Sequence, residues 1–150
     1  MNTILVASDG SPQGRAAVET AADLAAEEHA RLVCVHVVSV LDFVQEANGK
    51  ALAPPGRVPR AEDDPVLQEA VELAAGRGVV AERELLVGYP PNQICRLAAE
   101  IGVDLIVVGS RGLGPVKSVV IGSTSRAVLA HADRPVLVVR EAAVREATPA

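Results

Sequence analysis

The chain has 150 residues with a formal net charge of −5, and 49% of the residues are hydrophobic. This length suits one domain with one core, and the core must be aliphatic because Phe43 and Tyr89 are the only aromatic residues. A general nucleic-acid binder needs a basic face and, for single strands, aromatic stacking platforms, so the composition argues against that class.

The sequence shows no clear signal peptide, membrane span, disulfide pattern or metal-ligand spacing. The start of the chain lacks a basic segment followed by a long apolar run, and no apolar stretch has the length of a membrane span. Cys34 and Cys95 lie in apolar segments without CxxC spacing, so we expect two reduced, buried thiols. We expect a cytoplasmic protein with no membrane partner. The histidines share no metal-ligand spacing and are treated as structural: His29, His36 and His131.

The first half of the chain predicts two strands around a helix. Residues 3–8 form a short apolar run that ends in turn residues, and residues 31–38 form a second one. Residues 11–29 predict a helix, with serine at the N-cap and proline in the first turn. Prolines and glycines interrupt residues 39–63, where we expect a mobile, variable loop with at most a short helical turn.

The second half repeats the alternation of helix and strand. The expected helices cover residues 64–76, 88–102 and 123–131, and the expected strands cover residues 79–87, 104–108 and 135–140. Residues 141–150 look like a flexible tail. The alternation predicts one α/β domain over residues 1–150, an open doubly wound parallel sheet with helices on both faces.

The most informative segment is the glycine-rich stretch after the fourth expected strand, residues 109–126. In an open parallel sheet, ligands bind beyond the carboxyl ends of the strands, where the strand order reverses. The first strand also ends in a polar cluster, residues 8–10 (SDG). If these two strands are neighbours, the two loops face each other across that crevice.

The residue types in this stretch suit an anion. Gly109, Gly112 and Gly122 would let the backbone approach a ligand closely. Residues 123–125 (STS) open a helix, and the N–H groups and dipole of a helix start favour negative charge. The alternative is that the glycines only make turns. The stretch is neither a Walker A loop nor the dinucleotide fingerprint.

The charges in residues 109–126 also favour an anion as the ligand. No acidic residue lies between Asp104 and Asp133, whereas Arg111, Lys117 and Arg126 lie in that window. The first turn of a helix usually favours acidic residues, but this one has Arg126 instead. An external anion such as a phosphate would supply the missing negative charge. The alternative is that these basic residues only contact solvent.

The spacing Gly109-x2-Gly112-x9-Gly122-Ser123 resembles the nucleotide-binding signature of the ATP-binding branch of universal stress proteins. Other blocks agree, namely ILVASDGS, VHVV, GYP, DLIVVGSRGLG and GSTSRAVLAHADRPVLVV. The resemblance covers nearly the whole chain except residues 39–63. It implies a five-stranded sheet with strand order 3-2-1-4-5, and it implies ATP and Mg²⁺ as ligands.

The resemblance also implies roles for individual residues. Asp9 would lie near the ribose or the Mg²⁺ ion, and Val38 would present backbone groups to the adenine. Asp9 has a second interpretation, since an aspartate often bonds its own backbone two residues on and stabilises a turn. The implied nucleotide-binding set is Ala7, Ser8, Asp9, Val37, Val38, Gly109, Arg111, Gly112, Gly122, Ser123, Thr124 and Ser125.

Three function classes remain open. The chain could be a regulatory protein whose ATP occupancy alters its shape or partners, a slow ATPase or autokinase, or an interaction module with structurally bound nucleotide. Efficient phosphoryl transfer needs a positioned base, a metal clamp and a cation on the γ-phosphate. The sequence offers Asp9 as one candidate carboxylate and no dedicated base, which disfavours dedicated catalysis.

The last expected strand predicts a homodimer through residues 135–140. Its core reads PVLVV, apolar on both faces, and an edge strand must be covered in a soluble protein. Pairing with the same strand of a second copy would cover both edges through a two-fold axis. The family resemblance implies such dimers. The alternative is a monomer whose tail folds back over the edge.

Overall fold

The computed structural model describes residues 1–39, 60–110 and 121–140, so most of the expected loop and all of the expected tail lie outside this part. Helices and strands alternate along it as predicted. The strands are β1 (Thr3–Ala7), β2 (Arg31–Val38), β3 (Ala81–Val87), β4 (Leu105–Gly109) and β5 (Val136–Val139). The helices are α1 (Pro12–Glu28), the 3-10 helix η1 (Ala61–Asp63), α3 (Pro65–Ala75), α4 (Pro90–Ile101) and α5 (Ser123–His131).

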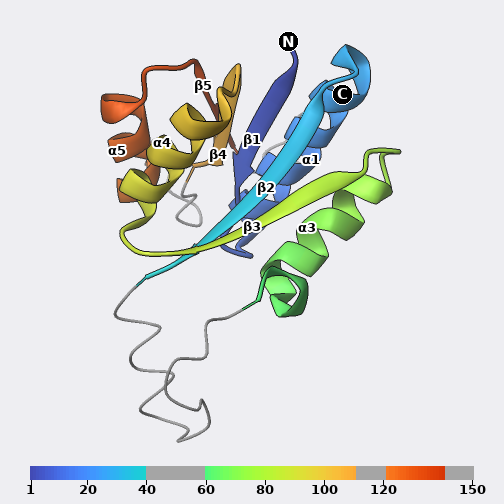
Figure 1. The fold of residues 1–150 in the computed structure, drawn as a ribbon, viewed down its shortest axis with the longest axis horizontal. Helices are drawn as coiled ribbons and strands as arrows, with labels where there is room; N and C mark the ends of the chain where they lie inside the picture. The colour runs from blue at the N-terminus through green and yellow to red at the C-terminus, as the bar shows by residue number, and fades with distance from the viewer. Residues whose placement is uncertain (40–59, 111–120, 141–150) are drawn as a thin grey trace, which may run out of the picture.

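The strands form one parallel sheet in the order β3-β2-β1-β4-β5. The chain starts in the centre, runs to one edge through β2 and β3, and returns to β4 and β5 on the other side of β1 (Figure 1). The predicted fold, an open doubly wound α/β sheet of this strand order, is therefore confirmed. Because β1 and β4 pair directly, their carboxyl ends lie side by side.

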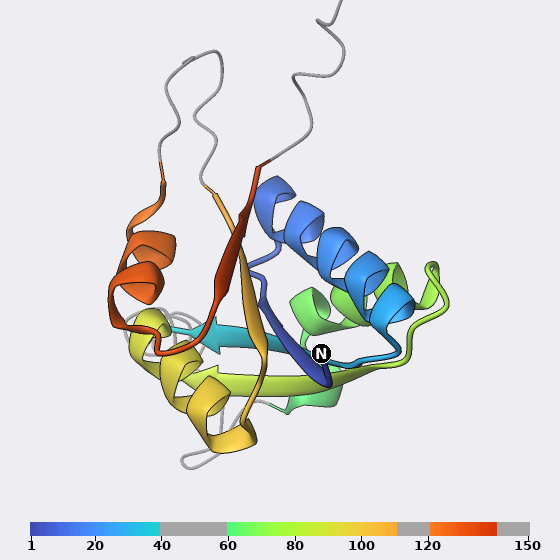
Figure 2. The same cartoon turned by 90° about the horizontal axis from the view of Figure 1, so that it is seen from above.

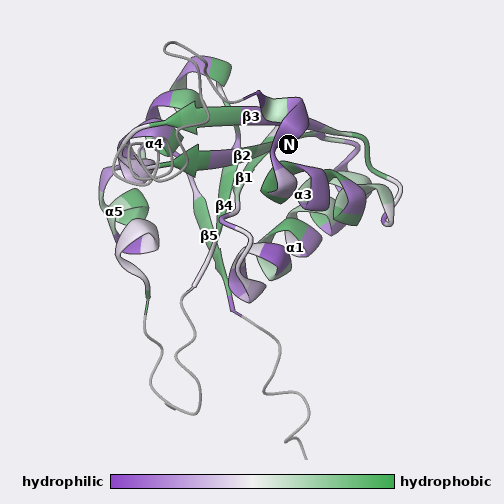
Figure 3. Ribbon diagram, turned by 90° about the horizontal axis from the view of Figure 1, so that it is seen from below, coloured by the Kyte–Doolittle hydropathy of each residue, from purple (hydrophilic) through white to green (hydrophobic). Residues whose placement is uncertain are grey.

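The helices cover both faces of the sheet. Helices α1 and α3 pack on one face, and α4 and α5 pack on the other (Figure 2). Since successive strand residues point to opposite faces, Ile4 and Val6 join the first layer and Leu5 joins the second. Figure 3 shows the hydrophobic strands enclosed between helices that carry polar residues. No helix in the described ranges is long and apolar enough to cross a bilayer.

The helix ends follow from local sequence. The side chain of Ser11 accepts the N–H of Gly14 at the start of α1, and Asp64 accepts the N–H of Leu67 at the start of α3. Proline follows each cap, at a position where its missing N–H would have no intrahelical partner. Gly102 ends α4 in the left-handed region with φ 76°, which glycine adopts without strain.

Strand β3 begins later than the sequence predicts. The expected strand starts at Val79, but the turn after α3 passes through Gly78 at φ 78° and leaves Val80 95% exposed. Pairing with β2 starts only at Ala81, opposite Leu32. Apolar character alone therefore overestimated the strand. The last strand is also shorter than expected, covering residues 136–139 rather than 135–140.

Strand β4 begins one residue later than predicted because Asp104 has a different role. Its Oδ2 atom accepts the backbone N–H groups of Asn2 and Thr3, at 2.7 and 3.0 Å. These backbone hydrogen bonds hold the pKa of the Asp104 carboxyl below its usual value, because they favour the charged form. The carboxylate thereby connects the start of β1 to the chain that leads into β4.

The two cysteines differ in burial. Cys34 lies on β2 beneath α1 and α3, and burial raises the pKa of its thiol to about 12. Cys95 is only half-buried on α4, so the prediction of a second buried thiol is wrong. The reason is its place on the helix, since the neighbouring Ile94 takes the inner position. Both thiols are free.

Candidate functional site

A pocket of about 650 Å³ opens at the carboxyl ends of β1, β2 and β4. It lies where the strand order reverses between β1 and β4, which is the place where open α/β sheets bind ligands. Every predicted site residue within the described ranges lines it: Ala7, Ser8, Asp9, Val37, Val38, Gly109, Gly122, Ser123, Thr124 and Ser125.

Other predicted residues lie outside the described part, and some lining residues were not predicted. Arg111, Gly112 and Lys117 belong to the undescribed range 111–120. The pocket wall also contains Ser11, Gln13, Gly14, Val35, His36, Ser39, Asp64, Pro90, Ile94, Val108 and Ser110. Gln13 and Gly14 could have been found, since they occupy the first turn after the polar SDGS segment. The contributions of α3 and α4 depend on packing that no local pattern indicates.

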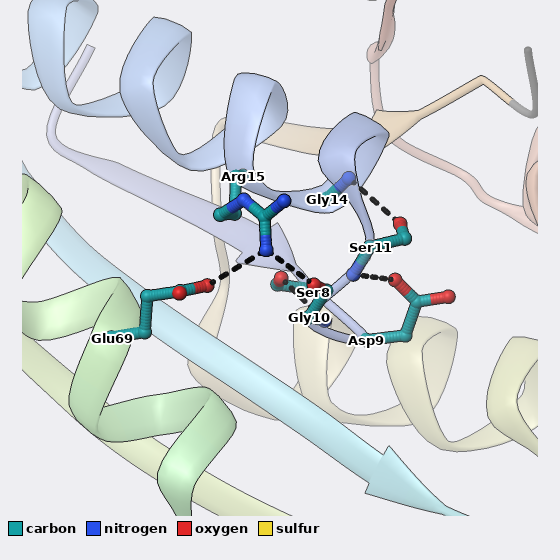
Figure 4. A network of polar contacts seen from close by, with 7 residues as sticks. All are labelled: Ser8, Asp9, Gly10, Ser11, Gly14, Arg15 and Glu69. Carbon is teal, nitrogen blue, oxygen red and sulfur yellow. Dashed lines mark hydrogen bonds and ion pairs between the residues drawn. The ribbon is translucent and has the colours of Figure 1, made fainter.

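Side-chain hydrogen bonds organise the loop between β1 and α1 (Figure 4). The Oγ of Ser8 accepts the N–H of Gly10 at 3.2 Å, and the Oδ1 of Asp9 accepts the N–H of Ser11 at 3.0 Å. The Oγ of Ser11 then accepts the N–H of Gly14 at 3.1 Å. The turn role of Asp9 is thus present in the structure, and its carboxylate still lines the pocket.

Helices α1 and α3 hold this loop from outside. Arg15 of α1 donates from Nη1 to the carbonyl oxygen of Gly10 at 2.9 Å, and the same nitrogen lies 3.6 Å from Oε1 of Glu69 on α3 (Figure 4). Gly10 has φ 83°, and a Cβ atom there would lie 3.1 Å from Val66 Cγ2. Glycine is required because the loop needs both the left-handed conformation and the space.

The end of β4 packs directly against the first turn of α1. A Cβ atom on Gly109 would lie 2.5 Å from the carbonyl oxygen of Gln13 and 2.7 Å from its carbonyl carbon. Such distances exclude any side chain unless the backbone moves. The Oγ of Ser125 donates to the carbonyl oxygen of Gly109 at 2.6 Å, which fixes α5 to the same point. The two loops at the pocket are therefore in backbone contact.

The N-terminus of α5 faces the pocket without a side-chain cap. Its N-cap residue is Gly122, with φ −62° and ψ 159°, and its first turn contains no acidic residue. The initial N–H groups of a helix have no intrahelical partners, and the helix dipole makes this end positive. Gly122, Ser123 and Thr124 line the pocket. This end of the pocket is suited to an anion.

His36 and Asp64 form a pair on another wall of the pocket. The Nδ1 atom of His36 lies 2.9 Å from Oδ2 of Asp64, and the side chains are 17% and 13% exposed. No sequence pattern assigns His36 a role at the site, because its partner is 28 residues away in the chain.

The carboxylates suit a metal ion only if a ligand brings further oxygen atoms. Within the described residues, no group of three His, Cys, Asp or Glu side chains could hold a metal. Mg²⁺ is commonly bound by one or two carboxylates together with phosphate oxygens and water. Asp9 at the pocket wall fits that arrangement, and it does not fit a resident all-protein metal site.

Comparisons with known proteins agree on one family. A profile of the universal stress protein family matches residues 1–140. The universal stress protein YxiE of Bacillus subtilis is 36% identical over 146 residues, covering 93% of this chain and 99% of YxiE. A universal stress protein of Thermus aquaticus is 41% identical over 140 residues, covering 92% and 98%. The solved structure of a universal stress protein in complex with cAMP has a TM-score of 0.68 at 26% identity, covering 94% and 98%.

Proposed function

Because this chain belongs to the universal stress protein family, we propose that it is a regulatory protein that binds ATP with Mg²⁺ and changes conformation or partners with nucleotide occupancy. The observation that carries the proposal is the uncapped start of α5, which lines the same pocket as Asp9. A helix N-terminus with glycine at the cap suits phosphate oxygens, because its N–H groups can donate to them directly.

The dimensions of the sheet support one orientation of the nucleotide. Strands β2 and β4 lie on either side of β1, so their ends are separated by about 10 Å. Phosphates at Gly122–Thr124 would place the ribose near Asp9 and Gly109 and the base near the end of β2. There, backbone groups of Val37 and Val38 would meet the adenine edge. A relative in this family has been solved with cAMP, which supports an adenine nucleotide as the ligand.

Each group has a limited task in this arrangement. The N–H groups at the start of α5 would hold the phosphates, and Asp9 would supply one carboxylate oxygen to Mg²⁺. Arg15 and the close contact between Gly109 and Gln13 would keep the loops in position. A bound Mg²⁺ would neutralise phosphate charge. Efficient turnover would also need a base and a cation positioned at the γ-phosphate, and we favour regulation over it.

The proposal includes a cytoplasmic homodimer formed through β5. This edge strand reads VLVV, and its residues are half-buried in the single chain. The opposite edge strand, β3, carries Glu82, Arg83 and Glu84, and charged residues discourage strand pairing. Of the two sheet edges, β5 is the one suited to a second copy.

The direct test is to identify and titrate the ligand. Protein purified without added nucleotide would be denatured and its supernatant analysed by chromatography and mass spectrometry. ATP binding would then be measured by calorimetry with and without Mg²⁺, and hydrolysis would be timed. We expect bound adenine nucleotide, Mg²⁺-assisted binding and negligible turnover. Absence of ATP binding would refute the proposal, and rapid hydrolysis would favour the ATPase alternative.

Gly122→Val tests the position of the phosphates. The backbone angles of Gly122 lie in the extended region that any residue adopts, so valine should not disturb the fold. Its branched side chain would occupy the phosphate's approach to α5, and we expect ATP binding to be lost in a folded protein whose melting temperature falls only by the cost of the poorer N-cap. Unchanged ATP affinity would exclude α5 as the phosphate site.

Asp9 requires two variants, because it already stabilises a turn. Asp9→Asn keeps an oxygen that can accept the N–H of Ser11 but removes the charge, whereas Asp9→Ala removes both. We expect both variants to lose the Mg²⁺ dependence of ATP binding. If only Asp9→Ala alters binding, the residue acts through the turn alone.

A further inference from the structure

The contact between His36 and Asp64 indicates which nitrogen of the neutral imidazole carries the proton. Asp64 Oδ2 accepts the N–H of Leu67 at 3.0 Å and lies 2.9 Å from His36 Nδ1. An ionised carboxylate has no proton to donate, so the proton of this contact must come from Nδ1. In the neutral imidazole the Nε2 atom is then a hydrogen-bond acceptor.

The Nε2 atom of His36 is left without a partner among the described residues and is not fully buried. Within the described residues, the side chain of His36 makes no hydrogen bond other than the one to Asp64. The buried nitrogen and oxygen atoms that lack a partner there do not include Nε2. Since His36 lines the pocket, its acceptor nitrogen is available to a ligand.

The place of His36 on the sheet decides which part of a nucleotide it can meet. It lies on β2 immediately before Val37, and β1 separates it from β4 and the start of α5. With phosphates at α5, this wall of the pocket is at the base end of the ligand. The inference therefore rests on the proposed nucleotide binding, and it adds a side chain to the backbone groups expected to read the base.

We propose that His36, held by Asp64, selects 6-aminopurine nucleotides over 6-oxopurine nucleotides. In the neutral imidazole, the Nε2 atom accepts a hydrogen bond from a 6-amino group. It meets a 6-oxo group as acceptor against acceptor, which leaves both atoms without a hydrogen bond and costs binding energy. His36 is thus a specificity residue, and Asp64 positions it while capping α3.

Competition between ATP and ITP tests this assignment, since the two ligands differ only at position 6 and in the proton that the 6-oxopurine carries on N1. We expect the wild-type protein to prefer ATP by at least about tenfold, the magnitude of one lost hydrogen bond. In His36→Gln the amide can donate or accept, so the ATP-to-ITP preference should fall about tenfold. Any preference that remains belongs to the backbone near Val38.

Asp64→Asn tests the positioning role separately. The Oδ2 atom of Asp64 serves both the Leu67 N–H and His36 Nδ1, so asparagine can place either its oxygen or its nitrogen at this point. With the nitrogen there, the amide donates to Nδ1, the imidazole proton moves to Nε2 and the α3 cap is lost, so the urea midpoint is measured alongside the binding. We expect the ATP preference to fall again. The exposed residues His131 and Asp133, substituted to Gln and Asn, are controls that should leave the preference unchanged.

The outcomes separate this inference from the proposed function. If the wild-type protein binds no nucleotide, the proposed function fails. Equal binding of ATP and ITP by the wild type, or an unchanged preference in His36→Gln, overturns the role of His36. A loss of preference for ATP over 2′-deoxy-ATP in His36→Gln, with the ITP ratio unchanged, overturns it as well, because the contact would then be to the ribose.

Discussion

The backbone contact between Gly109 and α1 gives the sharpest test of the site's construction. In Gly109→Ala the new Cβ atom would lie 2.5 Å from the Gln13 carbonyl oxygen, whereas ordinary van der Waals contacts begin at 3.4 Å. Either β4 or the first turn of α1 must therefore move by about 0.9 Å, the difference between these distances. The partner atoms belong to the backbone, so no side-chain rotation can relieve the clash.

The expected cost is that of overpacking a tightly packed site. One methyl group forced against backbone destabilises a protein by about 1–3 kcal/mol. For a chain of this length, each kcal/mol corresponds to about 2–4 °C in melting temperature. We therefore expect Gly109→Ala to melt about 4–8 °C below wild type, taking about 2 kcal/mol as the central value. ATP affinity should also fall, because Gly109 lines the pocket.

Urea denaturation followed by far-ultraviolet circular dichroism measures this effect, because the chain has no tryptophan. Gly76→Ala is the matched control. A Cβ atom there would meet nothing closer than 3.5 Å, and φ is −61°. That substitution should be neutral or should stabilise the fold by up to about 1 kcal/mol, because alanine reduces the conformational entropy of the unfolded chain. A Gly109→Ala protein with the wild-type urea midpoint would refute the backbone contact.

Further predictions concern thiols, acid stability and assembly. Because burial raises the pKa of Cys34 to about 12, Cys34 should resist alkylation in the native protein while Cys95 reacts, as peptide mass spectrometry would reveal; rapid native labelling of Cys34 would contradict its burial. The pKa of Asp104 is lowered in the folded protein, so its carboxylate stabilises the fold at pH values above its unfolded pKa of about 3.8, and this stabilisation is lost as the pH falls through the folded pKa. Asp104→Asn should therefore have a lower urea midpoint than wild type at neutral pH, and the two midpoints should converge in acid. Light scattering should find a dimer at micromolar concentration and a folded monomer for the pair Leu137→Lys and Val139→Lys; a monomeric wild type would contradict pairing through β5.

The sequence predicted those elements whose ends are encoded locally. Strand β2 and helix α5 begin and end at the predicted residues, since turn residues and Gly122 mark their ends. The start of β4 was missed because Asp104 bonds to the N–H groups of Asn2 and Thr3, about a hundred residues away in sequence. A partner so distant leaves no periodic signal.

The same distinction applies to the candidate site. Asp9 follows β1, and Ser123 begins the helix that comes after β4, so the topology of a doubly wound sheet was enough to bring them to one pocket. His36 and Asp64 meet only because α3 starts beside the end of β2, after a long intervening segment. In this chain, residues held by strand ends were predictable, and residues held by packing of α3 on the sheet were not.

The aliphatic core has a spectroscopic consequence. Within the described residues the only aromatic side chain is that of Tyr89, which is 63% exposed, and the chain contains no tryptophan. The protein itself therefore absorbs near-ultraviolet light very weakly. A purine ring absorbs much more strongly than one tyrosine, so a bound nucleotide would dominate the absorption spectrum of the purified protein. The shape of that spectrum is then a direct measure of the fraction of molecules that carry a nucleotide.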